Sequence, residues 1–242
     1  MKASFLTLAS AALTASIVGI SAPAQAFSFG SGGIQFDQDT SVEFTFDQSH
    51  GAYTSSLWVY SVENSALDNG TKLFYETKQS DNSWENEWKG TFGNAVTSTN
   101  GQVTQVFNFL KDKVYALVLY SDAFSGNPFQ QSVTSTTALN PTGTQQAVLG
   151  NFNLNYGSTS PFSAANGGKG ADQFAAVSLS DLVNGVKISF DDRGNGNDAD
   201  FQDFTVFAKA ASNTESVPEP ASMAGLMLVG GAIAASRRKR AV

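Results

Sequence analysis

Apolar and polar side chains alternate along much of the chain with the period of two that is typical of β-strands. In residues 42–46, Val42, Phe44 and Phe46 alternate with Glu43 and Thr45. Successive side chains of a strand point to opposite faces of its sheet, so this pattern predicts a strand with one buried face. Comparable runs predict further strands at 57–62, 72–77, 148–156, 174–179, 186–190 and 201–207.

The strongest run, residues 113–120, is apolar on both of its faces. A strand that is buried on both faces has apolar side chains on both, so 113–120 is expected at the centre of a sheet. Residues 103–110 are ambiguous between strand and helix, and the spacing of their apolar positions fits the helical period better. The long, polar and weakly patterned stretch 121–146 is expected to be a surface loop or an irregular edge.

Clusters of Gly, Asn, Asp and Ser separate the predicted strands, as in turns. The fold class expected is therefore all-β, with a single β-sandwich of the jelly-roll type over residues 27–209 and a linker at 210–216. A signal peptide at 1–26 and a short C-terminal transmembrane sorting helix are expected to flank this domain.

The N-terminal segment has the three parts of a secretory signal peptide. Lys2 provides a positive start, residues 5–20 form an apolar stretch, and Ala24 and Ala26 provide the small side chains that signal peptidase requires. The alternative is a weak N-terminal membrane anchor. The expected mature protein begins near Phe27.

The C-terminal segment 217–242 has a second pattern of three parts. A short motif comes first, an apolar stretch follows at 221–236, and a basic cluster ends the chain. At about 1.5 Å per residue, a helix over 221–236 would reach roughly 24 Å, short of the roughly 30 Å hydrocarbon core. The basic cluster is expected to stay cytoplasmic, which places the preceding domain across the membrane. The motif and the basic cluster consist of Val217, Pro218, Glu219, Pro220, Arg237, Arg238, Lys239 and Arg240.

This segment resembles the PEP-CTERM sorting signal of exported bacterial proteins. The resemblance implies export across the inner membrane and a transient anchor in the membrane through the C-terminal helix. It also implies that an exosortase cuts near the Pro-Glu-Pro motif, after signal peptidase has removed the N-terminus. The alternative is a simple, permanent C-terminal anchor.

Composition and charge exclude several functions. The chain has no cysteine and a single histidine, His50, so disulfides, thiol nucleophiles and multi-histidine metal sites are excluded. Removing the five basic residues and the one acidic residue of the two terminal segments from the totals of 14 and 21 leaves 9 and 20. The resulting net charge of −11 over residues 27–217 argues against nucleic acid as a partner and suits cation binding.

An acidic run at 191–203 is the strongest candidate site. It combines carboxylates, amides and glycines, which are the oxygen donors and the flexible backbone that calcium uses. The candidate ligands are Asp191, Asp192, Asn195, Asp198, Asp200 and Asp203, with Asp203 the least certain because it would lie on the other face of a regular strand. The alternative is an acidic turn that caps its own backbone without an ion.

The same run, with the strand before it, resembles the end of an uncharacterised bacterial extracellular domain. That domain has a Phe-Glu-Asp, Gly-rich turn, Asp-x-Asp-Phe-Asn-Asp signature. Here Phe190, Asp191 and Asp192 match its first block, and the stretch 198–203 matches its second, with Gln202 in place of Asn. The resemblance implies a shared fold, and it assigns no reaction.

Trp84 and Trp88 form a candidate carbohydrate platform, which Trp58 and Tyr60 could join. The alternative for these tryptophans is packing in the core or at a sheet edge. A triad that used Asp47 and His50 would lack a nucleophile elbow, so no catalytic residue is expected. The sequence thus predicts a non-enzymatic structural or binding protein of the cell surface or the exopolysaccharide matrix, with matrix polysaccharide as a possible partner. The alternative is a carbohydrate-active hydrolase of that matrix.

Overall fold

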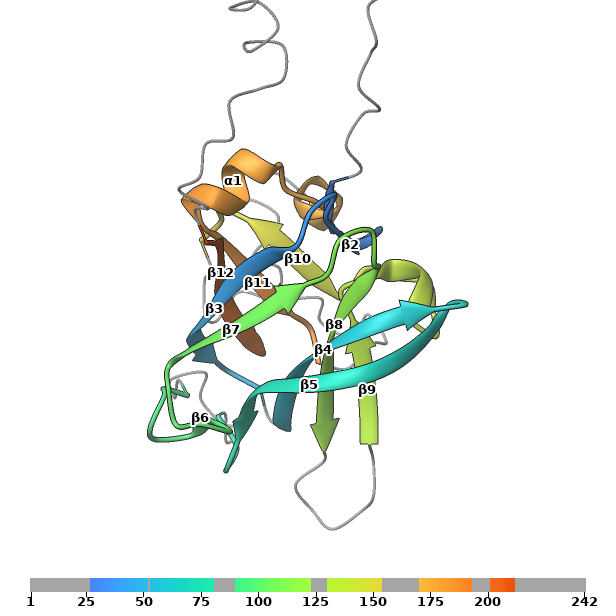
Figure 1. Ribbon diagram of the computed structural model, residues 1–242. Helices are drawn as coiled ribbons and strands as arrows, with labels where there is room; N and C mark the ends of the chain where they lie inside the picture. The colour runs from blue at the N-terminus through green and yellow to red at the C-terminus, as the bar shows by residue number, and fades with distance from the viewer. Residues whose placement is uncertain are drawn as a thin grey trace, which may run out of the picture.

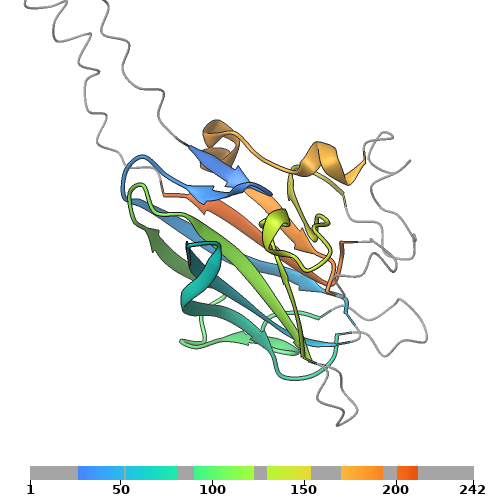
Figure 2. The same cartoon turned by 90° about the vertical axis from the view of Figure 1, so that its right-hand side faces the viewer.

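A computed structural model of the chain describes residues 27–51, 53–80, 90–122, 130–153, 170–192 and 201–211. In this part of the chain the strands form two antiparallel sheets, which lie one over the other as two layers (Figure 1, Figure 2). Helix is confined to a few short turns. The predicted all-β class is therefore confirmed.

The first sheet has seven strands, and the chain crosses between the two sheets several times. In spatial order it contains β1 (Ser28–Gly30), β2 (Gly33–Gln35), β8 (Tyr115–Asp122), β4 (Thr54–Glu63), β5 (Ala66–Glu76) and β6 (Val96–Ser98), with β9 (Gln130–Thr134) paired to β8. The second sheet contains β10 (Ala147–Gly150), β11 (Val186–Phe190), β12 (Phe204–Ala210), β3 (Thr40–Ser49) and β7 (Thr104–Phe109).

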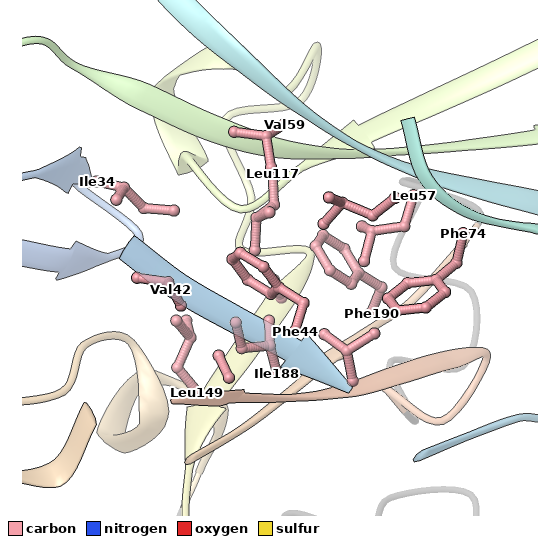
Figure 3. Close-up of a cluster of buried hydrophobic side chains, with 14 of the residues drawn as sticks. Ile34, Val42, Phe44, Leu57, Val59, Phe74, Leu117, Leu149, Ile188 and Phe190 are labelled. Atoms are coloured by element: carbon pink, nitrogen blue, oxygen red, sulfur yellow. The ribbon is translucent and has the colours of Figure 1, made fainter. Parts of the chain in front are cut away.

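The core lies between the two sheets and follows the alternation seen in the sequence. Val42, Phe44 and Phe46 of β3 are buried, whereas Glu43 between them and Asp47 after them are exposed. Figure 3 shows side chains of both sheets meeting in one cluster, with Leu57, Val59, Phe74 and Leu117 from the first and Val42, Phe44, Leu149, Ile188 and Phe190 from the second. The ring centroids of Phe46 and Phe74, on opposite sheets, are 6.0 Å apart. Burial of these inner faces from water holds the two layers together.

β8 lies inside its sheet, as its apolar character on both faces predicts. It pairs with β4 along one side and with β2 and β9 along the other. Leu117, Val118 and Leu119 are fully buried although they point alternately to the two faces. The predicted central strand is confirmed, with bounds shifted to Tyr115–Asp122.

The preferred helical reading of residues 103–110 is wrong. Residues 104–109 of this stretch form β7, which pairs with β3 from Thr40↔Phe109 to Thr45↔Thr104. Gln105 and Phe109 are buried while Val103, Val106 and Leu110 are exposed. The helical spacing failed as a guide because Val106 faces outward on this edge strand and Val103 and Leu110 are exposed just beyond its two ends.

The predicted strand at 174–179 is also wrong. The 3-10 helix η2 (Ala171–Phe174) comes first, and α1 (Leu179–Asn184) begins at the end of the predicted range. A capping box starts α1: the Ser178 hydroxyl accepts the Asp181 N–H, and the Asp181 carboxylate accepts the Ser178 N–H. This reciprocal pair satisfies backbone donors at the helix start and favours helix over strand.

Three further predicted bounds change. The described part of 121–146 is more ordered than expected, because β9 pairs with β8 and the 3-10 helix η1 (Thr137–Leu139) follows it. β10 ends at Gly150, so the described part of 148–156 is strand only at its start. β12 begins at Phe204 rather than at residue 201 and ends at Ala210, inside the expected linker 210–216.

Among the described residues, no helix has the length and apolar character needed to cross a bilayer. The expected signal peptide (1–26) and the sorting segment (217–242) lie outside the described residues. The same is true of residues 212–216 of the expected linker.

Candidate metal centre

Three of the candidate ligands converge at the end of β11 and the start of β12. Asp191 and Asp192 follow the last residue of β11, and Asp203 precedes the first residue of β12. The two strands are antiparallel and pair Phe190 with Phe204. This register brings the two chain segments that carry the carboxylates side by side.

Backbone hydrogen bonds fix the segments that carry these carboxylates. The Asp191 N–H donates to the Gln146 carbonyl at 3.1 Å, and the Asp203 N–H donates to the Phe190 carbonyl at 3.1 Å. The Asp192 N–H donates to Oδ2 of Asp203 at 2.8 Å. The carboxylates therefore stand on an extension of the sheet rather than on a free loop.

The three carboxylates are close together and largely shielded from solvent. One oxygen from each of Asp191, Asp192 and Asp203 lies within 4.8 Å of the others, and the first two residues are 1% and 3% exposed. Like unit charges 4 Å apart repel by about 4 kcal/mol at an effective dielectric constant of about 20. A divalent cation among these oxygens would turn that repulsion into attraction.

The donor set fits calcium. Calcium takes six to eight oxygens at about 2.3–2.6 Å, so two of its ligand atoms are at most about 5 Å apart. The separation limit of 4.8 Å among Asp191, Asp192 and Asp203 falls within that span. Three carboxylates supply up to six oxygens, and calcium accepts carboxylates that bind through one or both oxygens.

A segment distant in sequence forms a wall of this centre. His50 is 3% exposed, and its backbone N–H donates to the backbone carbonyl of Asp203 at 3.0 Å. A Cβ atom added to Gly51 would lie 2.9 Å from Oδ2 of Asp192 and 3.4 Å from Oδ1 of Asp203. The absence of a side chain at Gly51 is what lets the backbone approach the carboxylates this closely.

A small apolar cluster, separate from the main core, supports the segment before Asp203. Phe201 is 3% exposed and packs with Val148, Phe152 and Phe174. Its φ of 53° lies in the left-handed region, which is rare for a bulky side chain. The buried ring holds residue 201 in this turn conformation and thereby fixes the start of the Gln202–Asp203 segment.

The structure places the other sequence candidates as follows. Asp191, Asp192 and Asp203 come together. Asp203 was predicted as the least certain ligand, because on a regular strand it would point away from the other carboxylates. It lies before the first residue of β12, so the alternation of a strand does not apply to it. Asn195, Asp198 and Asp200 lie outside the described residues, as do Trp84 and Trp88. Asp47 is at the surface, with Oδ2 3.7 Å from Nζ of Lys187.

Sequence reasoning missed a second buried acidic group, Glu76 at the end of β5. Its Oε2 accepts the Ser55 N–H at 2.7 Å, and its Oε1 accepts the Ser80 hydroxyl, which also contacts the Ser49 hydroxyl. Burial raises the pKa of Glu76 to about 7, although the bonds from Ser49, Ser80 and Ser55 lower it. No local pattern marks this site in the sequence, because Ser49, Ser55 and Ser80 come from three different segments.

Comparison of the chain with protein-family models, with curated proteins and with solved structures finds no match. The fold and the site therefore define a class rather than a family. That class is an all-β protein of two antiparallel sheets, with three clustered carboxylates at the ends of two neighbouring strands.

Proposed function

We propose that this chain is an exported, non-enzymatic component of the cell surface or of an exopolysaccharide matrix, built as a jelly-roll sandwich and stabilised by calcium. The two terminal segments support export, since they combine a secretory signal pattern with a tail that resembles a sorting signal. The net charge of −11 over residues 27–217 suits a soluble extracellular domain.

The single structural observation behind the calcium part is the convergence of Asp191, Asp192 and Asp203. A chain without cysteine has no disulfide to fasten its strand ends outside the cell. A cation held by these carboxylates would join the end of β11 to the start of β12, next to the Gly51 backbone. Extracellular calcium sites work at about 10⁻⁴–10⁻³ M, so the ion would be bound outside the cell.

Thermal unfolding of the purified protein in calcium and in chelator tests this proposal. Calcium at ten times its Kd stabilises the bound state by about 1.4 kcal/mol, which raises the Tm by about 3–6 °C for a domain of this size. Magnesium substitutes poorly, because it demands a tighter octahedron and gives up its water reluctantly.

Matched variants make the test specific. Asp192→Asn and Asp203→Asn keep the shape and one acceptor oxygen but remove a charge, so each shrinks the calcium-dependent rise in Tm. Glu43→Gln, at an exposed position of β3, removes a charge far from the carboxylates and keeps the full rise. Asp198→Ala combined with Asp200→Ala shows whether the acidic turn adds ligands. An equal Tm in calcium and chelator, with no ion in the purified protein, would leave the carboxylates as a self-capped turn.

A further inference from the structure

The outer face of the seven-stranded sheet carries a cluster of aromatic rings. On β4, Leu57 and Val59 point into the core, whereas Trp58 and Tyr60 point outward and are half-buried. Tyr120 of β8 lies on the same outer face, because it pairs with Ser56, two residues before Trp58. We call Trp58, Tyr60 and Tyr120 the outer aromatic cluster.

The three rings of the outer aromatic cluster are in mutual contact. The centroid of Trp58 is 6.0 Å from that of Tyr60 and 6.2 Å from that of Tyr120, and the two tyrosine rings are 6.1 Å apart. The Tyr120 hydroxyl donates to the Tyr60 hydroxyl at 3.2 Å, and the Trp58 indole N–H donates to the Ser56 hydroxyl at 3.0 Å. These bonds restrict the rings to one arrangement on the sheet.

Strand β5 supplies the floor and one side of this cluster. A Cβ atom at Gly70 would lie 2.3 Å from the Tyr60 ring, so that ring rests directly on the strand backbone. The Lys72 ammonium lies 4.8 Å from the centroid of Trp58 and 5.1 Å from that of Tyr75. The lysine charge is thus held over ring faces.

The chemistry of this face is unusual for an exposed sheet. The solvent face of an antiparallel sheet is normally polar, whereas this one carries three half-buried aromatic rings, two of which bear hydroxyl groups. The most exposed aliphatic side chains of the described residues, Val106 and Leu110, belong instead to β7 and its end, in the other sheet. Aromatic rings next to hydroxyl groups can contact a ligand that has apolar C–H groups on its faces and hydroxyl groups around its rim.

We propose that the outer aromatic cluster binds a neutral polysaccharide of pyranose units. One side of a pyranose ring presents C–H groups, which stack on the electron-rich face of an aromatic ring, and its rim presents hydroxyls that bond to side chains such as Ser56. The net charge of −11 over residues 27–217 repels polyanions, which favours a neutral chain over one of uronic acids.

The ionisation state of the cluster agrees with this ligand. Burial and the hydrogen bond to Tyr60 raise the pKa of Tyr120 to about 12. Its hydroxyl therefore stays neutral over the physiological range and keeps the proton that it donates to Tyr60. This inference rests on the proposed matrix function and names the ligand class and the surface for it.

The test is calorimetric titration of the purified protein with neutral hexasaccharides of β-linked glucose, xylose and mannose, and with a hexamer of galacturonic acid. At least one neutral probe is expected to bind. Trp58→Ala lowers the affinity for that probe at least tenfold, and Trp58→Phe, which keeps a packed ring, lowers it less. Phe207→Ala, at a half-buried ring on the outer face of the other sheet, leaves it unchanged.

Other outcomes overturn the inference. Binding of the uronate probe alone, or of none of the probes, excludes a neutral polysaccharide. Loss of binding in Trp84→Ala with Trp88→Ala but not in Trp58→Ala places the sugar site elsewhere. Self-association that Trp58→Ala abolishes identifies the cluster as an interface between copies. The calcium-dependent rise in Tm, measured on the same samples, does not depend on sugar binding. It therefore tests the proposed function separately.

Discussion

Oδ2 of Asp203 accepts a hydrogen bond from the backbone N–H of Asp192 at 2.8 Å, across the ends of two paired strands. One carboxylate oxygen of Asp203 is thereby fixed in position, while Asp191 and Asp192 each place an oxygen within 4.8 Å of an Asp203 oxygen. Calcium sites in proteins gain affinity when their ligands are held in place before the ion binds. The hydrogen bond makes Asp203 such a preorganised ligand.

Gly51→Ala should weaken calcium binding without unfolding the protein. The added methyl group would lie 2.9 Å from Oδ2 of Asp192, which is too close, so the carboxylate must turn away. We expect calcium affinity to fall about tenfold, equal to about 1.4 kcal/mol, and the calcium-dependent rise in Tm to shrink. Thermal unfolding in calcium and in chelator measures this.

Gly32→Ala is the matched control, because a Cβ atom there meets nothing within 4 Å. It should retain the full calcium response. An equal response of the Gly51→Ala and Gly32→Ala variants would show that the Asp192 carboxylate takes no part in binding.

Stability should fall as the pH rises through the folded-state pKa of Glu76. Burial raises this pKa from 4.5 to about 7, so the folded state holds a proton that the unfolded state has released. The contribution of Glu76 is complete below pH 4.5, declines between the two values and is lost above pH 7. The full loss is about 3 kcal/mol.

Glu76→Gln should remove this dependence, because Gln has the shape of the protonated acid and can still bond to the Ser55 N–H and the Ser80 hydroxyl. Denaturant unfolding at pH 5 and pH 8 should give Glu76→Gln a smaller difference in unfolding free energy than the parent protein. The exposed Glu43→Gln change should leave the difference as it is. A Glu76→Gln variant that is as pH-dependent as the parent would mean that Glu76 titrates normally.

The exported protein should run from about Phe27 to near Pro218 or Pro220. Signal peptidase is expected to cut after Ala26, and a sorting protease near the Pro-Glu-Pro motif. Intact mass spectrometry of the protein recovered outside the cytoplasm measures both ends. A mass that still includes the basic cluster at 237–240 would contradict sorting and favour a permanent anchor. Pro218→Ala with Pro220→Ala should retain that cluster.

The pattern of apolar and polar positions was enough to predict those elements whose side chains report directly on burial. The alternation of Val42, Phe44 and Phe46 predicted β3, and the doubly apolar run predicted the interior position of β8. The sequence also located the acidic run from which Asp191, Asp192 and Asp203 come. For the two strands the pattern reflects which face water reaches, and for the acidic run it is the local density of oxygen donors, so each signal is local in the chain.

Features that depend on partners far apart in the chain emerge only in the folded protein. Residues 104–109 form strand β7 because they pair with the edge of β3, although the apolar spacing of 103–110 suits a helix. Gly51 reaches the carboxylates because β3 ends beside β12, and serines from separate segments surround Glu76. Trp58, Tyr60 and Tyr120 meet because β4 pairs with β8. Strand pairing joins residues tens of positions apart, and the pairing register sets which side chains meet, so no local pattern reveals these contacts.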